Sequence, residues 1–169
     1  MLVKSSGNPR SFPGKPCENS ELHYTYAVNS PAQSNTLSHL SPRAAWQLLQ
    51  QNPRATLIDI RSSMEFLFVG HPHGSVHVPW IDDPTWEVNP DFVGAVRKEL
   101  AVRGRTSADP VILICRSGKR SLEASAVLRA QGFTAVSHID EGFEGELDAE
   151  HHRSSVGGWR FHGLPWEQC

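Results

Sequence analysis

The chain has 169 residues, of which 38% are hydrophobic and 20% charged, and this length and composition suit one globular domain with a sizeable core. Sixteen basic against eighteen acidic residues give a net charge of −2, which favours neither a nucleic acid nor an anionic membrane as a partner. No apolar stretch approaches the ~20 residues of a membrane helix, and no signal peptide is evident. Three cysteines are too few for a disulfide framework. We therefore expect a cytoplasmic protein.

The N-terminal segment differs in composition from the rest of the chain. Residues 1–20 are rich in Ser, Gly, Pro, Lys and Asn, a composition that cannot offset the entropy lost on ordering. We therefore expect a flexible arm over residues 1–20 and a single domain over residues 21–169. Alternating tyrosines favour a short edge strand within residues 22–28.

The first regular elements are a strand, a helix and a second strand. A short strand is expected over residues 37–40, followed by a helix with Ser41 as its N-cap and Pro42 as its first residue. This helix should stop before Asn52, which precedes a proline. The next strand is expected over residues 56–60.

Two charged residues lie at the end of the second strand. Asp59 and Arg61 have two possible roles: they orient a substrate, or they hold the structure together. In the structural role, which we favour, Asp59 accepts hydrogen bonds from loop amides and Arg61 pairs with a carboxylate such as Glu65. A short helix over residues 63–69 should follow, and then a turn and a brief strand over residues 76–78.

Histidines cluster near this turn. The spacing of His71, His73 and His77 invites a zinc site, but zinc needs a fourth ligand and a rigid element to hold the imidazoles. We favour a polar turn in which the histidines form hydrogen bonds, and we predict no metal. Three further histidines are expected in solvent: His151, His152 and His162.

A long connection without periodicity spans residues 79–90. Its residues Trp80 and Trp86 either wall the mouth of a pocket or cover the core, and the sequence does not separate these roles. Asn89 is expected to cap a helix that begins at Pro90 and ends at Gly104. Its buried face should consist of Phe92, Val93, Val96 and Leu100.

The central feature is an apolar run over residues 111–114 that ends on Cys115. A run that is apolar on both faces predicts a strand buried in a parallel sheet, so Cys115 lies at the carboxyl end of a strand, where open α/β sheets bind ligands. Gly118 permits a tight turn in which successive N–H groups point inward as an anion-binding nest. The helix expected over residues 121–131 adds the positive end of its dipole. Its buried face should consist of Ala124, Val127 and Leu128.

Three basic residues, Arg116, Lys119 and Arg120, add positive charge around Cys115. Amides, helix dipole and cations all favour a thiolate over a thiol, which makes Cys115 a candidate nucleophile that needs no neighbouring histidine. The alternative is an inert core cysteine, but such a residue gains nothing from these neighbours.

Counting excludes two related motifs. A P-loop needs a glycine five residues before Gly118, where Leu113 stands. A cysteine phosphatase loop needs an arginine six residues after its nucleophile, where Ser121 stands, one position beyond Arg120. The ring of amides should therefore be tighter, and better sized for a cysteine that bears one extra sulfur than for a phosphoryl group.

The C-terminal part contains a strand within residues 133–139 and, over residues 140–147, a loop expected to enter a short helix. Residues 149–158 are polar and expected to be exposed. Residues 159–166 contain enough aromatic side chains to pack back on the domain as an extended tail. Cys169 is most simply an exposed terminal thiol.

The loop Cys115-Arg116-Ser117-Gly118-Lys119-Arg120-Ser121 resembles the active loop of the rhodanese family of sulfurtransferases. The segments Asp59-Ile60-Arg61, Glu65-Phe66 and Gly70-His71-Pro72-His73-Gly74-Ser75 are similar to further family motifs, in the same order. The resemblance covers about residues 36–166. It implies an α/β fold with a mostly parallel five-stranded sheet flanked by helices on both faces, and structural roles for Asp59 and Arg61. Gly142-Phe143 departs from the family's usual glycine pair, which affects the expected pocket shape.

The expected function is that of a sulfurtransferase without cofactors. Cys115 takes a sulfane sulfur from a small anionic donor such as thiosulfate or a persulfide, and passes it to a thiol, cyanide or a sulfur-carrier protein. The amides from Arg116 to Ser121 hold the persulfide charge. One alternative is a sulfur-relay partner with little turnover of its own. A less favoured one is a phosphatase or arsenate reductase on the same scaffold.

Overall fold

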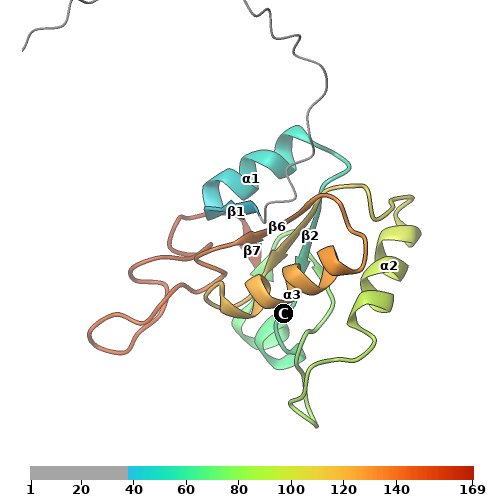
Figure 1. Ribbon diagram of the computed structural model, residues 1–169. Helices are drawn as coiled ribbons and strands as arrows, with labels where there is room; N and C mark the ends of the chain where they lie inside the picture. Colours follow the sequence, from blue (N-terminus) through green and yellow to red (C-terminus); the bar gives the residue numbers. More distant parts are fainter. Residues whose placement is uncertain (1–37) are drawn as a thin grey trace, which may run out of the picture. The chain divides into compact units, whose positions relative to one another are not determined.

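The computed structural model describes residues 38–169, and its centre is a five-stranded sheet in which every pairing is parallel (Figure 1). The strands lie in the order β1 (Ser38–Leu40), β6 (Val136–Ile139), β5 (Val111–Ile114), β2 (Thr56–Asp59) and β4 (Val76–His77). This confirms the predicted α/β fold. Since β5 is the middle strand, the residue that follows it lies at the centre of the carboxyl edge of the sheet.

Helices cover both faces of the sheet (Figure 1). On one face, α2 (Phe92–Val102) and α3 (Lys119–Ala130) pack over Val111 and Leu113 of β5. On the other face, α1 (Pro42–Gln51) packs over Ile112 and Ile114. Successive residues of a strand point to opposite faces, so the four apolar residues of β5 serve two cores at once.

The helix boundaries follow local hydrogen bonds. The Ser41 hydroxyl accepts a hydrogen bond from the Ala44 amide at 3.3 Å, so the predicted cap of α1 is confirmed. The prediction that Asn89 caps a helix beginning at Pro90 is wrong by two residues. The Asn89 side chain instead accepts a hydrogen bond from the Asp91 amide at 2.9 Å. This contact forms a turn before the helix, and α2 begins at Phe92.

Short elements complete the carboxyl edge. The short helix predicted over residues 63–69 is confirmed: it begins at residue 63, continues as the π-helical turn η1 (Glu65–Val69), and leads to β3 (His71–Pro72). The C-terminal strand β7 (Trp166–Glu167) pairs with β3 in antiparallel fashion, and Trp159 is fully buried. The prediction that the tail packs back on the domain is therefore confirmed, but residues 159–163 form turns and are not extended as expected.

Two predictions for the second half of the chain are wrong. Residues 140–147 form turns without a helix, because Gly142 and Gly145 adopt positive φ angles and their neighbours bind other loops. Val127 of α3, expected in the core, is 37% exposed, and Ser125 takes the buried position beside Leu128.

Some predictions fall on residues that the structure does not describe. The arm over residues 1–20, the edge strand within residues 22–28, Leu37 and Cys17 all lie outside the described range. Within residues 38–169, no helix is long and apolar enough to cross a membrane.

Candidate active site

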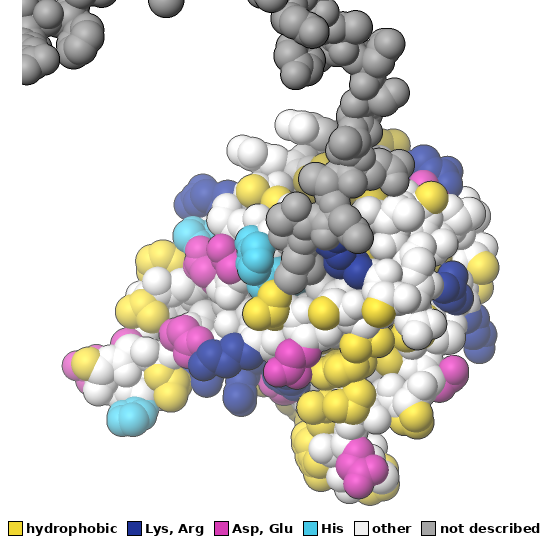
Figure 2. Space-filling model, in the orientation of Figure 1, with side chains coloured by type: hydrophobic (Ala, Val, Ile, Leu, Met, Phe, Trp, Pro, Cys, Tyr) yellow, Lys and Arg dark blue, Asp and Glu magenta, His cyan; other side chains and the backbone are white. Residues whose placement is uncertain are grey.

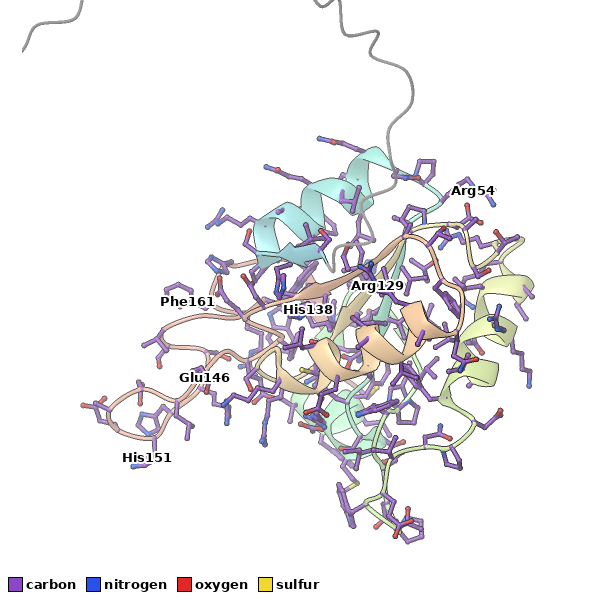
Figure 3. The ribbon with its side chains drawn as sticks, viewed as in Figure 1. Arg54, Arg129, His138, Glu146, His151 and Phe161 are labelled. Carbon is purple, nitrogen blue, oxygen red and sulfur yellow. The ribbon has the colours of Figure 1, made fainter. Side chains whose placement is uncertain are left out.

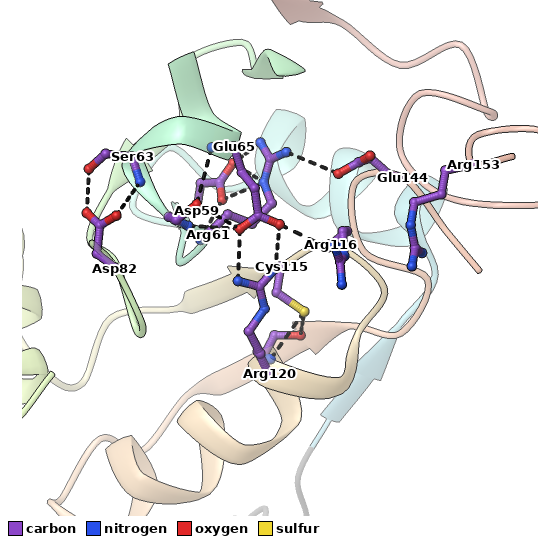
Figure 4. Close-up of polar contacts among 12 residues, drawn as sticks. Asp59, Arg61, Ser63, Glu65, Asp82, Cys115, Arg116, Arg120, Glu144 and Arg153 are labelled. Carbon is purple, nitrogen blue, oxygen red and sulfur yellow. Dashed lines mark hydrogen bonds and ion pairs between the residues drawn. The ribbon is translucent and has the colours of Figure 1, made fainter. Parts of the chain in front are cut away.

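Cys115 follows β5 directly, and its side chain is 1% exposed. One side of it packs against the core cluster beneath α2 and α3. The other side faces polar groups of its own loop. Its Sγ accepts the Gly118 amide at 3.2 Å and the Ser121 amide at 3.4 Å, and lies 3.4 Å from the Ser121 hydroxyl oxygen (Figure 4). Two of the predicted loop amides therefore point at the sulfur.

The start of α3 explains why these amides are available. The first N–H groups of a helix have no partner within it, and α3 begins at Lys119, with the first internal bond from the Leu122 amide to the Gly118 carbonyl. The amides of Lys119, Arg120 and Ser121 thus belong to the unpaired first turn, and the Ser121 amide is used by Sγ. The positive end of the α3 dipole lies at the same place.

Gly118 is required by geometry. Its φ is +89°, and a Cβ there would lie 1.8 Å from the carbonyl oxygen of Asp140. The loop after β6 therefore packs directly on the active loop. The amides of Phe143 and Glu144 donate to the carbonyls of Cys115 and Arg116 at 2.8 and 2.9 Å. These bonds fix the outer side of the loop.

The three basic residues are each engaged by a carboxylate. Arg120 donates two hydrogen bonds to Glu65, at 2.9 and 2.7 Å, and Arg116 lies 3.9 Å from the same carboxylate (Figure 4). Lys119 is paired with Glu146 at 3.3 Å. Burial raises the pKa of Glu65, but Arg120 and the amide and hydroxyl of Ser62 outweigh it and lower this pKa to about 2. Arg120 is thus paired closely, whereas Arg116 shares the same carboxylate at longer range, so the two arginines together keep one net positive charge beside Glu65.

Arg61 pairs with a carboxylate as predicted, but the partner is not Glu65, which was the example given. Arg61 pairs with Asp59 at 2.6 Å, with both side chains fully buried, and also donates to the Gly70 carbonyl. Its guanidinium lies 4.1 Å from the ring centroid of Phe143. Asp59 also accepts the Arg61 amide at 3.0 Å, as expected for its structural role. The pair connects the end of β2 with the loop that supports the active loop.

A hollow of about 440 Å³, called the mouth here, lies beside the loop at Arg116 and Arg120. It is lined by Ser62, Met64, Glu65, Trp86, Arg116 and Arg120. The two tryptophans of the long connection have different roles: Trp80 is buried against Phe92, whereas Trp86 is 58% exposed and forms part of the hollow. Figure 2 shows a band of hydrophobic side chains that extends from α3 to this loop.

The histidines of the turn serve as stacking and hydrogen-bonding groups. His71 and His77 stack on Phe66, with ring centroids 3.7 and 4.3 Å away, and bind the carbonyls of Phe66 and Arg61. Within residues 38–169, no three His, Cys, Asp or Glu side chains lie together as a metal would require. His162 was expected in solvent, but its side chain lies 2.8 Å from the Glu141 carboxylate.

The site thus unites Cys115, its loop amides, Arg120 and Glu65, while Lys119 points away from the mouth toward Glu146. Sequence reasoning missed the contributions of Met64 and Gly142. A Cβ at Gly142 would lie 2.6 Å from the carbonyls of Cys115 and Arg116. The available signal was that Gly142 keeps the first glycine of the expected pair while Phe143 departs from it.

Comparisons with known proteins agree with this fold. The family model for the rhodanese-like domain matches residues 41–148. The thiosulfate sulfurtransferase GlpE of Actinobacillus pleuropneumoniae is 31% identical over 134 residues, which cover 79% of this chain and 96% of the relative. The crystal structure of Rv0390 from M. tuberculosis is 39% identical, with a TM-score of 0.66, and covers 78% of this chain and 98% of that one.

A second solved structure is the polysulfide-sulfur transferase homodimer from Wolinella succinogenes, which is 27% identical with a TM-score of 0.50. The match covers 79% of this chain and 80% of that one. Fold, motif order and relatives lead to the same assignment: the chain belongs to the rhodanese-like domain family.

Proposed function

We propose that the protein is a sulfurtransferase in which Cys115 carries a sulfane sulfur as a persulfide. The observation that supports this most directly is the sulfur at the end of β5, which accepts two loop amides at the start of α3. Amides aimed at an atom stabilise negative charge there without reorganisation during the reaction. The likeness to a thiosulfate sulfurtransferase supports the same reaction class.

In the first half-reaction, the Cys115 thiolate attacks the outer sulfur of the donor. A new S–S bond forms at Cys115, the donor's own S–S bond breaks, and its electron pair leaves with the remainder, which is sulfite when thiosulfate is the donor. The persulfide carries the negative charge, and the unpaired amides of Lys119 and Arg120 extend the ring of donors around the outer sulfur.

In the second half-reaction, a nucleophile removes the outer sulfur and Cys115 returns as a thiolate. A cellular thiol, cyanide or the thiol of a carrier protein can serve as this acceptor. Arg116, which is half-exposed at the hollow and only loosely paired with Glu65, is placed to attract an anionic donor. We assign Arg120 to holding the first turn of α3 in place through Glu65.

Intact-protein mass spectrometry after incubation with thiosulfate tests the first half-reaction. The wild-type protein should gain the mass of one sulfur atom, and a reductant should remove it. A Cys169→Ser variant should gain the same mass, since Cys169 is exposed and remote in sequence from the loop. Cys115→Ser should not gain it, and turnover retained by Cys115→Ser would refute the assignment.

A relay partner that passes sulfur to another protein is a second candidate. The exposed apolar side chains of Met64 and Trp86 at the mouth favour the relay, because a small anion would not be bound through apolar contacts. Slow turnover of thiosulfate and cyanide, with rapid transfer from a persulfidated protein donor, would identify the relay. Hydrolysis of an aryl phosphate would instead indicate the phosphatase chemistry that the loop length disfavours.

A further inference from the structure

A buried histidine lies beneath the active loop and has no part in the mechanism above. His138 belongs to β6 and is 3% exposed. An ionisable side chain loses hydration when it is buried, so such residues are usually held by specific partners. His138 has one partner on each side of its ring.

The two partners connect Cys115 with the protein surface. On one side, the His138 Nδ1 lies 3.4 Å from the Ser121 hydroxyl oxygen, which itself lies 3.4 Å from the Cys115 Sγ. On the other side, the His138 Nε2 lies 2.8 Å from the Nδ1 of His39. His39 stands directly opposite His138 in the register of β1 and β6, and it is exposed. Figure 3 shows His138 on β6 next to α3.

We propose that Ser121, His138 and His39 form a proton relay that carries the thiol proton of Cys115 to solvent and returns it. The proposal rests on the proposed function, in which Cys115 must become a thiolate. Cys115 is only 1% exposed, so its thiol has very little direct contact with solvent before a donor enters the site. His138 and His39 are then positioning residues that act through Ser121.

The transfer conserves every proton and needs no redox partner. The S–H bond of Cys115 breaks as a new O–H bond forms at Ser121, whose original proton passes to the His138 Nδ1. The proton on the His138 Nε2 passes to the His39 Nδ1, and His39 releases the proton of its Nε2 to solvent. Each hydrogen bond in this row of residues, from Cys115 through Ser121 and His138 to His39, remains with its direction reversed. The Ser121 hydroxyl now donates to the thiolate.

The surroundings of His138 suit this role. Burial lowers the pKa of His138, and the charge of His39 lowers it further, against an opposing effect of Asp140 and the Ile139 backbone. His138 therefore stays neutral at neutral pH, with one ring nitrogen free to accept a proton. The ionisable groups that face it are His39 from β1, Cys115 after β5 and Asp140 after β6.

One competing contact sets the resting state. The Ser121 hydroxyl also lies 3.0 Å from the Gly118 carbonyl, its shortest contact, so at rest it donates there. The relay requires this hydroxyl to rotate toward His138, a rotation about a single side-chain bond. Catalytic hydrogen bonds are often long before the substrate binds, and the 3.4 Å contacts fit that pattern.

The test uses a Cys17→Ser/Cys169→Ser background, so that thiolate absorbance reports Cys115 alone. Thiolate absorbance and the rate of persulfide formation with thiosulfate are each measured against pH. His138→Gln and Ser121→Ala should slow persulfide formation about tenfold or more at neutral pH, and the deficit should disappear at alkaline pH. The midpoint of thiolate formation should move upward by about one pH unit, the effect of one lost hydrogen bond to a charged group.

His39→Gln offers a variant at an exposed position, so it tests the exit of the relay without disturbing the core; it should show the same pH-dependent deficit. His73→Gln, an exposed histidine outside the row, is the matched control and should behave as the parent. A deficit equal at every pH, or none in the three variants, would overturn the relay. Absence of any persulfide in the parent would instead refute the proposed function, while the thiolate titration still decides the relay.

Discussion

Replacing Glu65 with glutamine tests how the active loop is held. Glu65 accepts two hydrogen bonds from Arg120, 55 residues away in sequence, and its side chain is 18% exposed. Glu65→Gln removes the charge and keeps the size, so it resembles the protonated carboxyl. We expect a less stable protein and a less rigid first turn of α3.

The magnitude follows from the pKa of Glu65. The fall from an ordinary value of 4.5 to about 2 means that the ionised form stabilises the folded state, and at ~1.4 kcal/mol per pKa unit this amounts to about 3 kcal/mol. Because the folded pKa lies below the unfolded one, this stability is fully present above pH 4.5. It is lost as the pH falls toward 2.

Urea unfolding of wild type and Glu65→Gln at pH 7 and pH 3.5 measures the effect. The variant should be about 3 kcal/mol less stable at pH 7, and the difference should shrink by about 1 kcal/mol at pH 3.5, where the wild type has lost part of its own stabilisation. Glu99→Gln, which breaks the exposed pair with Arg103, is the control and should change stability by at most about 0.5 kcal/mol. A difference that is the same at both pH values would refute the role given to Glu65.

Three further substitutions probe the loop, its support and its mouth. Gly118→Ala should abolish persulfide loading and lower the melting temperature, because its Cβ would collide with the Asp140 backbone. The control is Gly104→Ala, at a glycine with φ +65° and open space around it, which should lower the melting temperature only slightly. Asp59→Ala should destabilise the fold by about 3–5 kcal/mol in urea unfolding, since it removes the nearest carboxylate from the buried Arg61 and leaves only Glu144, at 3.8 Å; unchanged stability would contradict this. Trp86→Ala should leave stability unchanged and raise the KM for bulky thiol acceptors but not for cyanide; equal effects on both would count against a role at the mouth.

The central strand and its loop were predictable because their signals are local. Four apolar residues before Cys115 define a strand buried on both faces, and Gly118 marks the turn that brings amides to the sulfur. The predicted cap at Ser41 held for the same reason, since it depends on contacts within three residues. Such features do not depend on how distant segments meet.

The partners of the charged residues could not be predicted, because they come from distant segments. Glu65 was assigned to Arg61, its neighbour in sequence, but it binds Arg120, and Arg61 turns back to Asp59. The row from Cys115 to His39 likewise joins three strands and a helix. No periodicity in the chain records which residues of neighbouring strands stand side by side.

The pairing of the loop cations changes the explanation of how this site handles negative charge. Sequence reasoning gave equal weight to three cations and to the amides, yet Arg120 and Lys119 are each bound to a glutamate. Pairing with a glutamate reduces the net field of a cation at the sulfur, although Arg120 still interacts with Cys115, whereas the amides of Gly118 and Ser121 point at the sulfur directly. The stability of an anion held mainly by amides depends on the position of the backbone. The contacts at Gly118 and Glu65 fix the loop from outside. They therefore matter as much to the proposed chemistry as the residues that could contact a donor.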